Sequence, residues 1–68
     1  MRELTRRERE VIQLAADGHI NGQISHHLGI KPETVKTYME TALQKLGATN
    51  RAHAAVIALH AGLIAPPW

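Results

Sequence analysis

The stretch that decides the fold runs from Gly22 to Leu46 and has the sequence GQISHHLGIKPETVKTYMETALQKL. Its apolar residues recur at spacings of three and four, which predicts a short helix over about 22–28 and a longer one over about 32–46. Gly29 ends the first helix, and Pro32 has the fixed φ that suits the first position of the second. A short helix, a tight turn containing glycine and a longer helix are typical of a helix-turn-helix motif.

The longer helix has two distinct faces. One is a stripe at i, i+4, i+8 and i+11, made of Val35, Met39, Leu43 and Leu46. The other is polar and rich in hydrogen-bonding groups. We therefore expect the stripe to be buried and the polar face to be exposed.

Two more helices flank this motif. Upstream, Thr5 and Glu8 form the S/T-x-x-E capping box of a helix over about 6–17. Downstream, Asn50 is a good cap for an alanine-rich helix over about 51–61. The predicted fold is all-α: a four-helix helix-turn-helix domain over residues 1–65, followed by a tail at 66–68.

The composition excludes several classes of protein. The 68 residues allow a single small domain, and no apolar stretch is long enough to cross a bilayer. We expect a cytoplasmic protein. The net charge of +2 is compatible with a polyanionic partner but does not require one. The absence of cysteine removes disulfides and thiolate zinc sites.

Neither catalysis nor metal binding finds support in the sequence. Ser25 is the only serine, and there is no nucleophile motif or glycine-rich phosphate loop, so we predict no enzyme and no cofactor. His26 and His27 are adjacent and point in different directions on a helix. His53 and His60 share a face but lie about 10 Å apart along the axis, so we predict no metal site.

Three segments together resemble one protein family. They are LTRREREVIQLAADG (4–18), GQISHHLGI (22–30) and ETVKTYMETALQKLGATNRAHA (33–54). They are similar to the LuxR/GerE family of DNA-binding domains over nearly the whole chain. The resemblance implies a four-helix bundle, with the third helix in the major groove of DNA and the fourth paired with its own copy.

The same resemblance assigns site residues. Base-reading positions fall at Lys36, Thr37 and Glu40. Positions that touch or approach the DNA backbone fall at Thr34 and Lys45, and the arginine that opens the fourth helix is Arg51.

The chemistry of these side chains suits the assignment. Lys36 can bind a phosphate or guanine, and Thr37 can donate, accept or meet a thymine methyl group. Ionised Glu40 can only accept, which suits the amino group of cytosine. The alternative for Glu40 is an i, i+4 ion pair with Lys36 on the helix surface.

The chain also departs from the family pattern. Ile20 and Gln23 stand where members have a Ser or Thr cap and a Glu, so we expect Asn21 to take over the capping. Gly22 replaces a frequent lysine, which weakens the second helix by up to ~1 kcal/mol. Lys31 replaces a Ser cap and cannot accept from the free amides, although it could reach a phosphate.

The predicted function is sequence-specific binding of duplex DNA by a transcription regulator. The expected homodimer forms through the fourth helix, either in free solution or only on DNA, with the small or apolar residues Ala54, Ile57, Ala58 and Ala61 at the interface. His53 and His60 on that helix suggest that dimer strength depends on pH. A receiver or sensor domain outside this chain would be a further partner, although the chain could also be a whole protein. The alternative function is a protein-interaction module with weak or no DNA binding, because the third helix has no net charge.

Overall fold

Four helices form in the predicted order in the computed structural model, which describes residues 3–68. They are α1 (Arg6–Ala16), α2 (Asn21–Leu28), α3 (Pro32–Leu46) and α4 (Arg51–His60). Residues 3–68 contain no strand, so the all-α prediction is confirmed. The predicted limits were wrong by one residue at the end of α1, the start of α2 and the end of α4, within the usual fraying of helix ends.

The start of α1 is closed by the predicted capping box. The backbone N–H of Glu8 donates to the hydroxyl oxygen of Thr5 (3.2 Å), and the backbone N–H of Thr5 donates to Glu8 Oε1 (2.8 Å). Each side chain thus satisfies an amide that has no partner inside the helix.

The start of α2 is capped differently from our expectation. Ile20, not Asn21, is the cap residue, and its side chain can accept nothing. The carboxamide oxygen of Gln23 accepts from the Ile20 backbone N–H at 3.0 Å, which supplies only half of a capping box. Asn21 is the first residue inside the helix, where its side chain is free to bind elsewhere.

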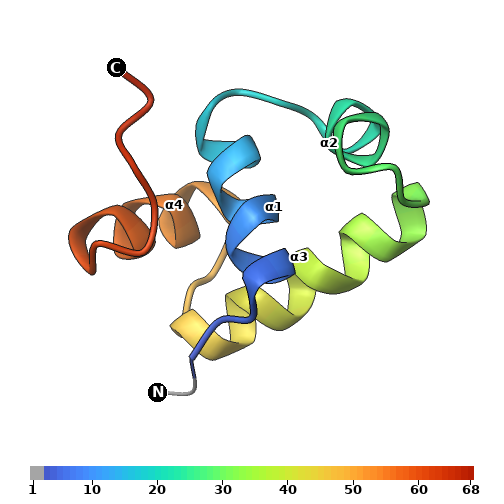
Figure 1. Ribbon diagram of the computed structural model, residues 1–68. Coiled ribbons are helices and arrows are strands. Elements are labelled where there is room, and N and C mark those ends of the chain that lie inside the picture. Colours follow the sequence, from blue (N-terminus) through green and yellow to red (C-terminus); the bar gives the residue numbers. More distant parts are fainter. Residues whose placement is uncertain (1–2) are drawn as a thin grey trace.

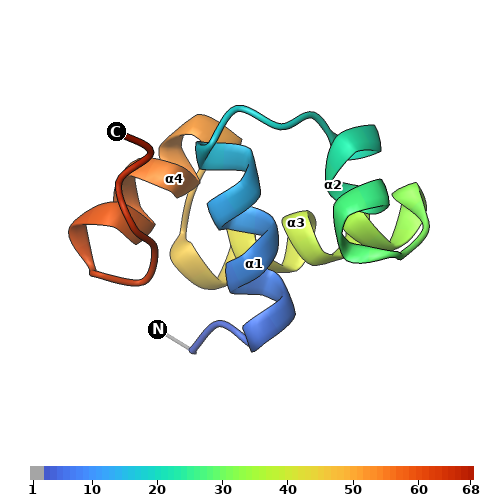
Figure 2. The same cartoon turned by 45° about the horizontal axis from the view of Figure 1, so that its top comes forward.

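α1 occupies the centre of the molecule and packs on each of the other three helices. α3 is the longest helix and crosses beneath α1, while α2 and α4 lie on opposite sides of it (Figures 1 and 2). α2 packs on α1 and α3 but not on α4. The helix-turn-helix pair α2–α3 therefore rests on α1, away from the body of α4.

The inward faces of all four helices form the core, and its largest fully buried side chains are Val11, Ile12, Ile24 and Val35. The predicted stripe of α3 was wrong at one position. Ala42 is completely buried, whereas Leu43 is only partly buried at the edge of the core. A small side chain at the centre lets α3 approach its neighbours closely.

The chain beyond α4 turns back onto the core. Ile64 is buried, and Leu63 packs beside it. The Gln13 side chain then pairs with the backbone of Ala65, donating to its carbonyl oxygen at 3.0 Å and accepting from its N–H at 2.7 Å. α1 thereby holds the segment just before the exposed residues 66–68. No helix within residues 3–68 has the length and apolar character needed to span a membrane.

Candidate nucleic-acid interface

α3 divides into a buried and an exposed face. Its buried residues are Val35, Met39, Ala42 and Leu46. Lys36, Thr37 and Glu40 are exposed, as are Lys31 and Glu33 at the amino end. Because the apolar face is anchored in the core, the exposed side chains stand on a rigid element.

Two charged groups on this face have no partner among the residues that the structure describes. Within residues 3–68, neither Lys36 nor Glu40 makes a side-chain hydrogen bond or an ion pair, so the alternative i, i+4 pair between them is not formed. The hydroxyl of Thr37 donates to the carbonyl oxygen of Glu33 one turn earlier, at 3.1 Å. Lys36 and Glu40 are thus available to an external ligand.

The first turn of α3 also faces outward. Lys31 is the cap residue, is exposed and makes no side-chain capping bond, as its chemistry predicts. Thr34 is partly buried, and its backbone N–H donates to the carbonyl oxygen of Lys31 at 3.0 Å. The exposed charges of α3 and its cap, Lys31 and Lys36 against Glu33 and Glu40, cancel.

Lys45 does not lie on the exposed face, which corrects the expectation from sequence. Its ammonium group is 2.8 Å from Glu8 Oε1, and only 11% and 6% of the two side chains are exposed. Burial alone would raise the pKa of Glu8, but the hydrogen bonds from Lys45 and from the Thr5 backbone outweigh it and hold that pKa below its usual range. Lys45 ties α3 to the capped end of α1.

Arg51 is likewise bound within the protein. Its guanidinium group donates to Asn21 Oδ1 at 2.9 Å and to the carbonyl oxygen of His19 at 3.1 Å. The side chain is partly buried beside the start of α2. Partners that lie 30 and 32 residues away along the chain leave no signal in local sequence.

The outward face of α4 differs from the predicted dimer surface. Ala54 and Ala58 are 0% exposed and belong to the core of the single chain, so they cannot meet a second copy. Ile57 is partly buried against the core, and Ala61 is exposed. Sequence reasoning missed Val56, which is 55% exposed. Local sequence gave no signal for it, because α4 is apolar nearly all round and alanines lie on both its buried and its exposed side.

On the outward face of α4, Val56 lies between two other exposed residues, Ala52 one turn before it and His60 one turn after it. At the start of the helix, His53 accepts from the Thr49 backbone N–H through Nδ1 (3.1 Å), while the Asn50 side chain accepts from the His53 backbone N–H (2.8 Å). The imidazole of His53 must be unprotonated at Nδ1 to accept this bond.

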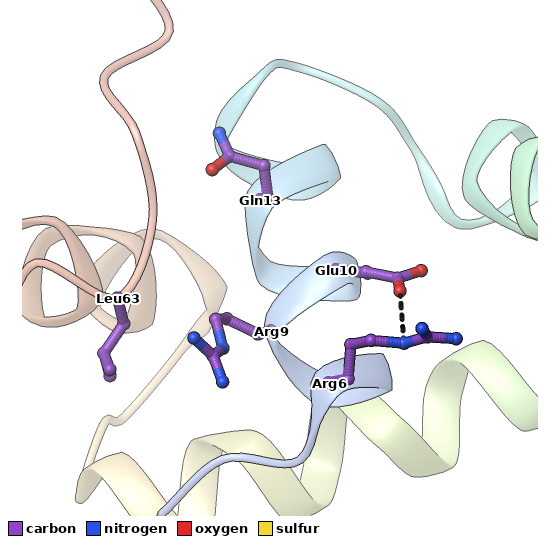
Figure 3. Close-up of a pocket in the computed structure, with 5 residues that line it drawn as sticks. All are labelled: Arg6, Arg9, Glu10, Gln13 and Leu63. Atoms are coloured by element: carbon purple, nitrogen blue, oxygen red, sulfur yellow. Dashed lines mark ion pairs between the residues drawn. The ribbon is translucent and has the colours of Figure 1, made fainter.

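Arg6 and Arg9 of α1 line an open cleft beside the segment that follows α4. Glu10 pairs with Arg6 at 3.3 Å and with Arg7 at 3.1 Å. Figure 3 shows Arg9 reaching toward Leu63 across the cleft, while the Arg6–Glu10 pair points to the other side of α1. Two of the three arginines of α1, Arg6 and Arg7, are thus paired with Glu10. Within residues 3–68, no three acidic or histidine side chains lie close enough together to hold a metal ion.

Comparison with protein families gives a match over most of the chain. The model of the family described as "Bacterial regulatory proteins, luxR family" (GerE) matches residues 2–58. The solved structure of the transcription factor GerE superimposes with a TM-score of 0.87 at 35% identity, over 94% of this chain and 97% of that one. A Vibrio cholerae VqmA dimer structure, of a LuxR-type receptor, gives a TM-score of 0.85 at 31% identity, over 96% of this chain and 30% of that one.

Individual relatives are transcription regulators of greater length. The transcriptional activator protein BjaR1 of Bradyrhizobium diazoefficiens is 43% identical over 63 residues, which is 93% of this chain and 26% of that protein. The transcriptional regulatory protein DegU of Brevibacillus brevis is 41% identical over 61 residues, 90% of this chain and 26% of its own. The chain therefore spans about a quarter of the length of these relatives.

Proposed function

Because this chain belongs to the LuxR family of bacterial regulatory proteins, whose helix-turn-helix domain binds DNA, we propose that it reads duplex DNA through the exposed face of α3. The observation that carries the proposal is that Lys36 and Glu40 have no partner within residues 3–68 and lie on a helix whose other face is buried in the core. The width of the major groove admits such a helix.

Five residues at and near the exposed face of α3 have a role in this proposal. Lys36 binds a phosphate or the acceptor edge of guanine, and Glu40 accepts from the amino group of cytosine. Thr37 lies between them and meets a base edge, while Lys31 and Thr34 approach the DNA backbone at the amino end of α3. Lys45 and Arg51 are left out of the DNA contacts, because their cationic groups are bound to Glu8 and to the start of α2.

The proposed assembly is a homodimer through the outward face of α4, centred on Val56. An isolated exposed valine beside Ala52 offers a small apolar contact that two copies can share around a two-fold axis. The contact is small, so we propose that two copies pair on DNA, where adjacent half-sites bring them together. A receiver or sensor domain that controls binding is also proposed, since the relatives are much longer than this chain.

A second candidate function rests on the cancelled charge of α3. With Lys31 and Lys36 balanced by Glu33 and Glu40, nonspecific attraction to phosphates is weak. The polar face of α3 would then suit a protein partner. Salt dependence separates the two functions, because DNA binding must weaken steeply as salt rises.

The test is selection of bound sequences from a random duplex library at two salt concentrations, with the wild type and Lys36→Ala. DNA reading predicts a two-fold symmetric motif that the variant fails to enrich. Failure of the wild type to enrich any sequence even at low salt would favour the protein-interaction module.

A further inference from the structure

We propose that Arg51 is a positioning residue, which holds the start of α2 in place so that α2 can support α3 against DNA, and that it makes no contact with phosphate. The inference rests on the proposed DNA-reading function and adds a role for a residue outside the reading face. It gives Arg51, the first residue of α4, a structural role in supporting the helix-turn-helix motif.

Arg51 joins two helices that otherwise do not touch, and we call its two hydrogen bonds the tie. α2 and α4 do not pack on each other. Arg51 spans the gap with two hydrogen bonds, one to the Asn21 side chain in the first turn of α2 and one to the His19 backbone in the preceding loop. Within residues 3–68, no other side-chain hydrogen bond joins these two helices.

α2 needs such support because its own start is weak. Ile20 supplies no capping oxygen, and only the Gln23 half of the capping box is present. Gly22 adds backbone freedom in the first turn. The helix has only eight residues, too few to be stable without tertiary contacts. The charged side chain of Arg51 donates to Asn21 and His19 and so orders the start of α2, which the local sequence alone does not do.

The contact also requires an arginine. A planar guanidinium presents donors in a rigid fork, so one side chain can satisfy a carboxamide oxygen and a carbonyl oxygen together. A lysine carries the same charge at a single point on a flexible stem and cannot reproduce both bonds. Against a phosphate exposed to solvent, the two residues are much closer substitutes. The Arg51→Lys variant therefore separates the two roles.

The first experiment measures binding to the selected duplex and to a random duplex over a range of salt. Arg51→Lys should lower affinity for the selected site by about tenfold, the order expected when a charged hydrogen bond is lost. The slope of log affinity against log salt should be unchanged, because no phosphate contact is removed. Lys36→Gln, from the reading face, should reduce that slope by about 0.9 if Lys36 neutralises one phosphate.

Arg6→Gln removes one exposed charge from α1, one that pairs with Glu10 and takes no part in the bonds of Arg51, and controls for general electrostatics. It should leave the preference for the selected site over the random duplex unchanged. If Arg51→Lys binds like the wild type while Arg51→Gln loses about 0.9 in slope, Arg51 is a phosphate contact and the proposal is wrong.

The second experiment needs no DNA, so it tests the tie even if no duplex is ever selected. Amide hydrogen exchange is compared in the free wild type, Arg51→Lys, Asn21→Ala and Asn21→Asp. In Arg51→Lys and Asn21→Ala, which lose the tie, amide exchange should accelerate in α2, notably at Ile24. The acceleration should be smaller in α1 and α3. Asn21→Asp keeps an acceptor for Arg51 and should retain protection. Unchanged α2 protection, or equal loss in all four helices in both variants, would overturn the positioning role.

Discussion

Glu8 is bound by two groups that are far apart in sequence. Its carboxylate accepts from the Thr5 backbone at the start of α1 and from Lys45 near the end of α3. One local bond completes a helix cap, and one distant bond joins two helices. The residue-level consequence is that a single buried carboxylate links helix formation to tertiary packing.

Replacing the cation of this pair should destabilise the domain strongly. Lys45→Ala leaves the Glu8 carboxylate buried without its counter-charge, and we expect a loss of about 3 kcal/mol in the free energy of unfolding. In a domain of this size that is a large part of the total stability. Urea denaturation measures it. Lys36→Ala, at an exposed and unpaired position, should change stability by less than about 0.5 kcal/mol.

The lowered pKa of Glu8 predicts acid sensitivity of a definite sign. The unfolded chain has the ordinary glutamate pKa of about 4.3, and the folded chain has a lower one. The stability that Glu8 contributes is therefore complete above pH ~4.3 and is lost as the pH falls through the folded pKa. Urea denaturation at pH 6 and pH 3 should show the wild type losing more stability than Glu8→Gln. Equal losses in the two proteins would contradict the linkage.

At the scale of the element, α2 is the weakest helix and α3 the best anchored. α2 has half a capping box and an internal glycine, whereas α3 opens on Pro32 and buries a continuous face. Both helices end on a glycine with a positive φ. The backbone must therefore be helical at Gly22, inside α2, and left-handed at Gly29, at its end.

Alanine substitution at these two glycines should have effects of opposite sign. Gly22 is helical and a Cβ there would meet nothing within 4 Å, so Gly22→Ala should stabilise the domain by about 0.5–1 kcal/mol. Gly29 has φ +68°, and Gly29→Ala should destabilise by about 1 kcal/mol although the space is equally open. Thermal unfolding measures both. Shifts of the same sign would mean that packing, not backbone conformation, governs this helix.

At the scale of the molecule, three surfaces serve different purposes. The outward face of α3 is proposed for DNA, the outward face of α4 for a second copy, and the inward faces of all four helices form one core. In the proposal, Arg51 connects the helix that pairs with a second copy to the helix that supports DNA reading.

A carboxylate at the centre of the α4 surface should separate pairing from DNA reading. Val56→Asp should lower cooperative binding to a duplex with two half-sites at least about tenfold, since the carboxylate would be buried there without a partner. Affinity for a single half-site and the stability of the monomer should not change, because Val56 is 55% exposed. Ala61→Asp, at an exposed position on another side of the helix end, should reduce cooperativity less than twofold. A larger loss of cooperativity in Ala61→Asp than in Val56→Asp would place the interface at the end of α4 instead.

Local sequence was sufficient for the helices and the overall architecture. Apolar spacing, the Thr5–Glu8 box, Pro32 and the terminal glycines act within a few residues, so the predicted limits agree with the structure to within one residue. The exposure of Lys36, Thr37 and Glu40 also follows from the period of α3. Family resemblance added the DNA-binding function. The contacts of these three residues with bases are still predictions.

The tertiary structure alone decided which polar groups find partners and which face of α4 is buried. Lys45 and Arg51 have the same exposed character in sequence as Lys36, but their partners are brought from 30 or more residues away by the packing of α2, α3 and α4 on α1. α4 is apolar nearly all round, so its period cannot tell an inward Ala54 from an outward Val56. Hydrophobic periodicity identifies a buried face only where a polar face opposes it. In α4 the close fit of small residues against the core made that choice.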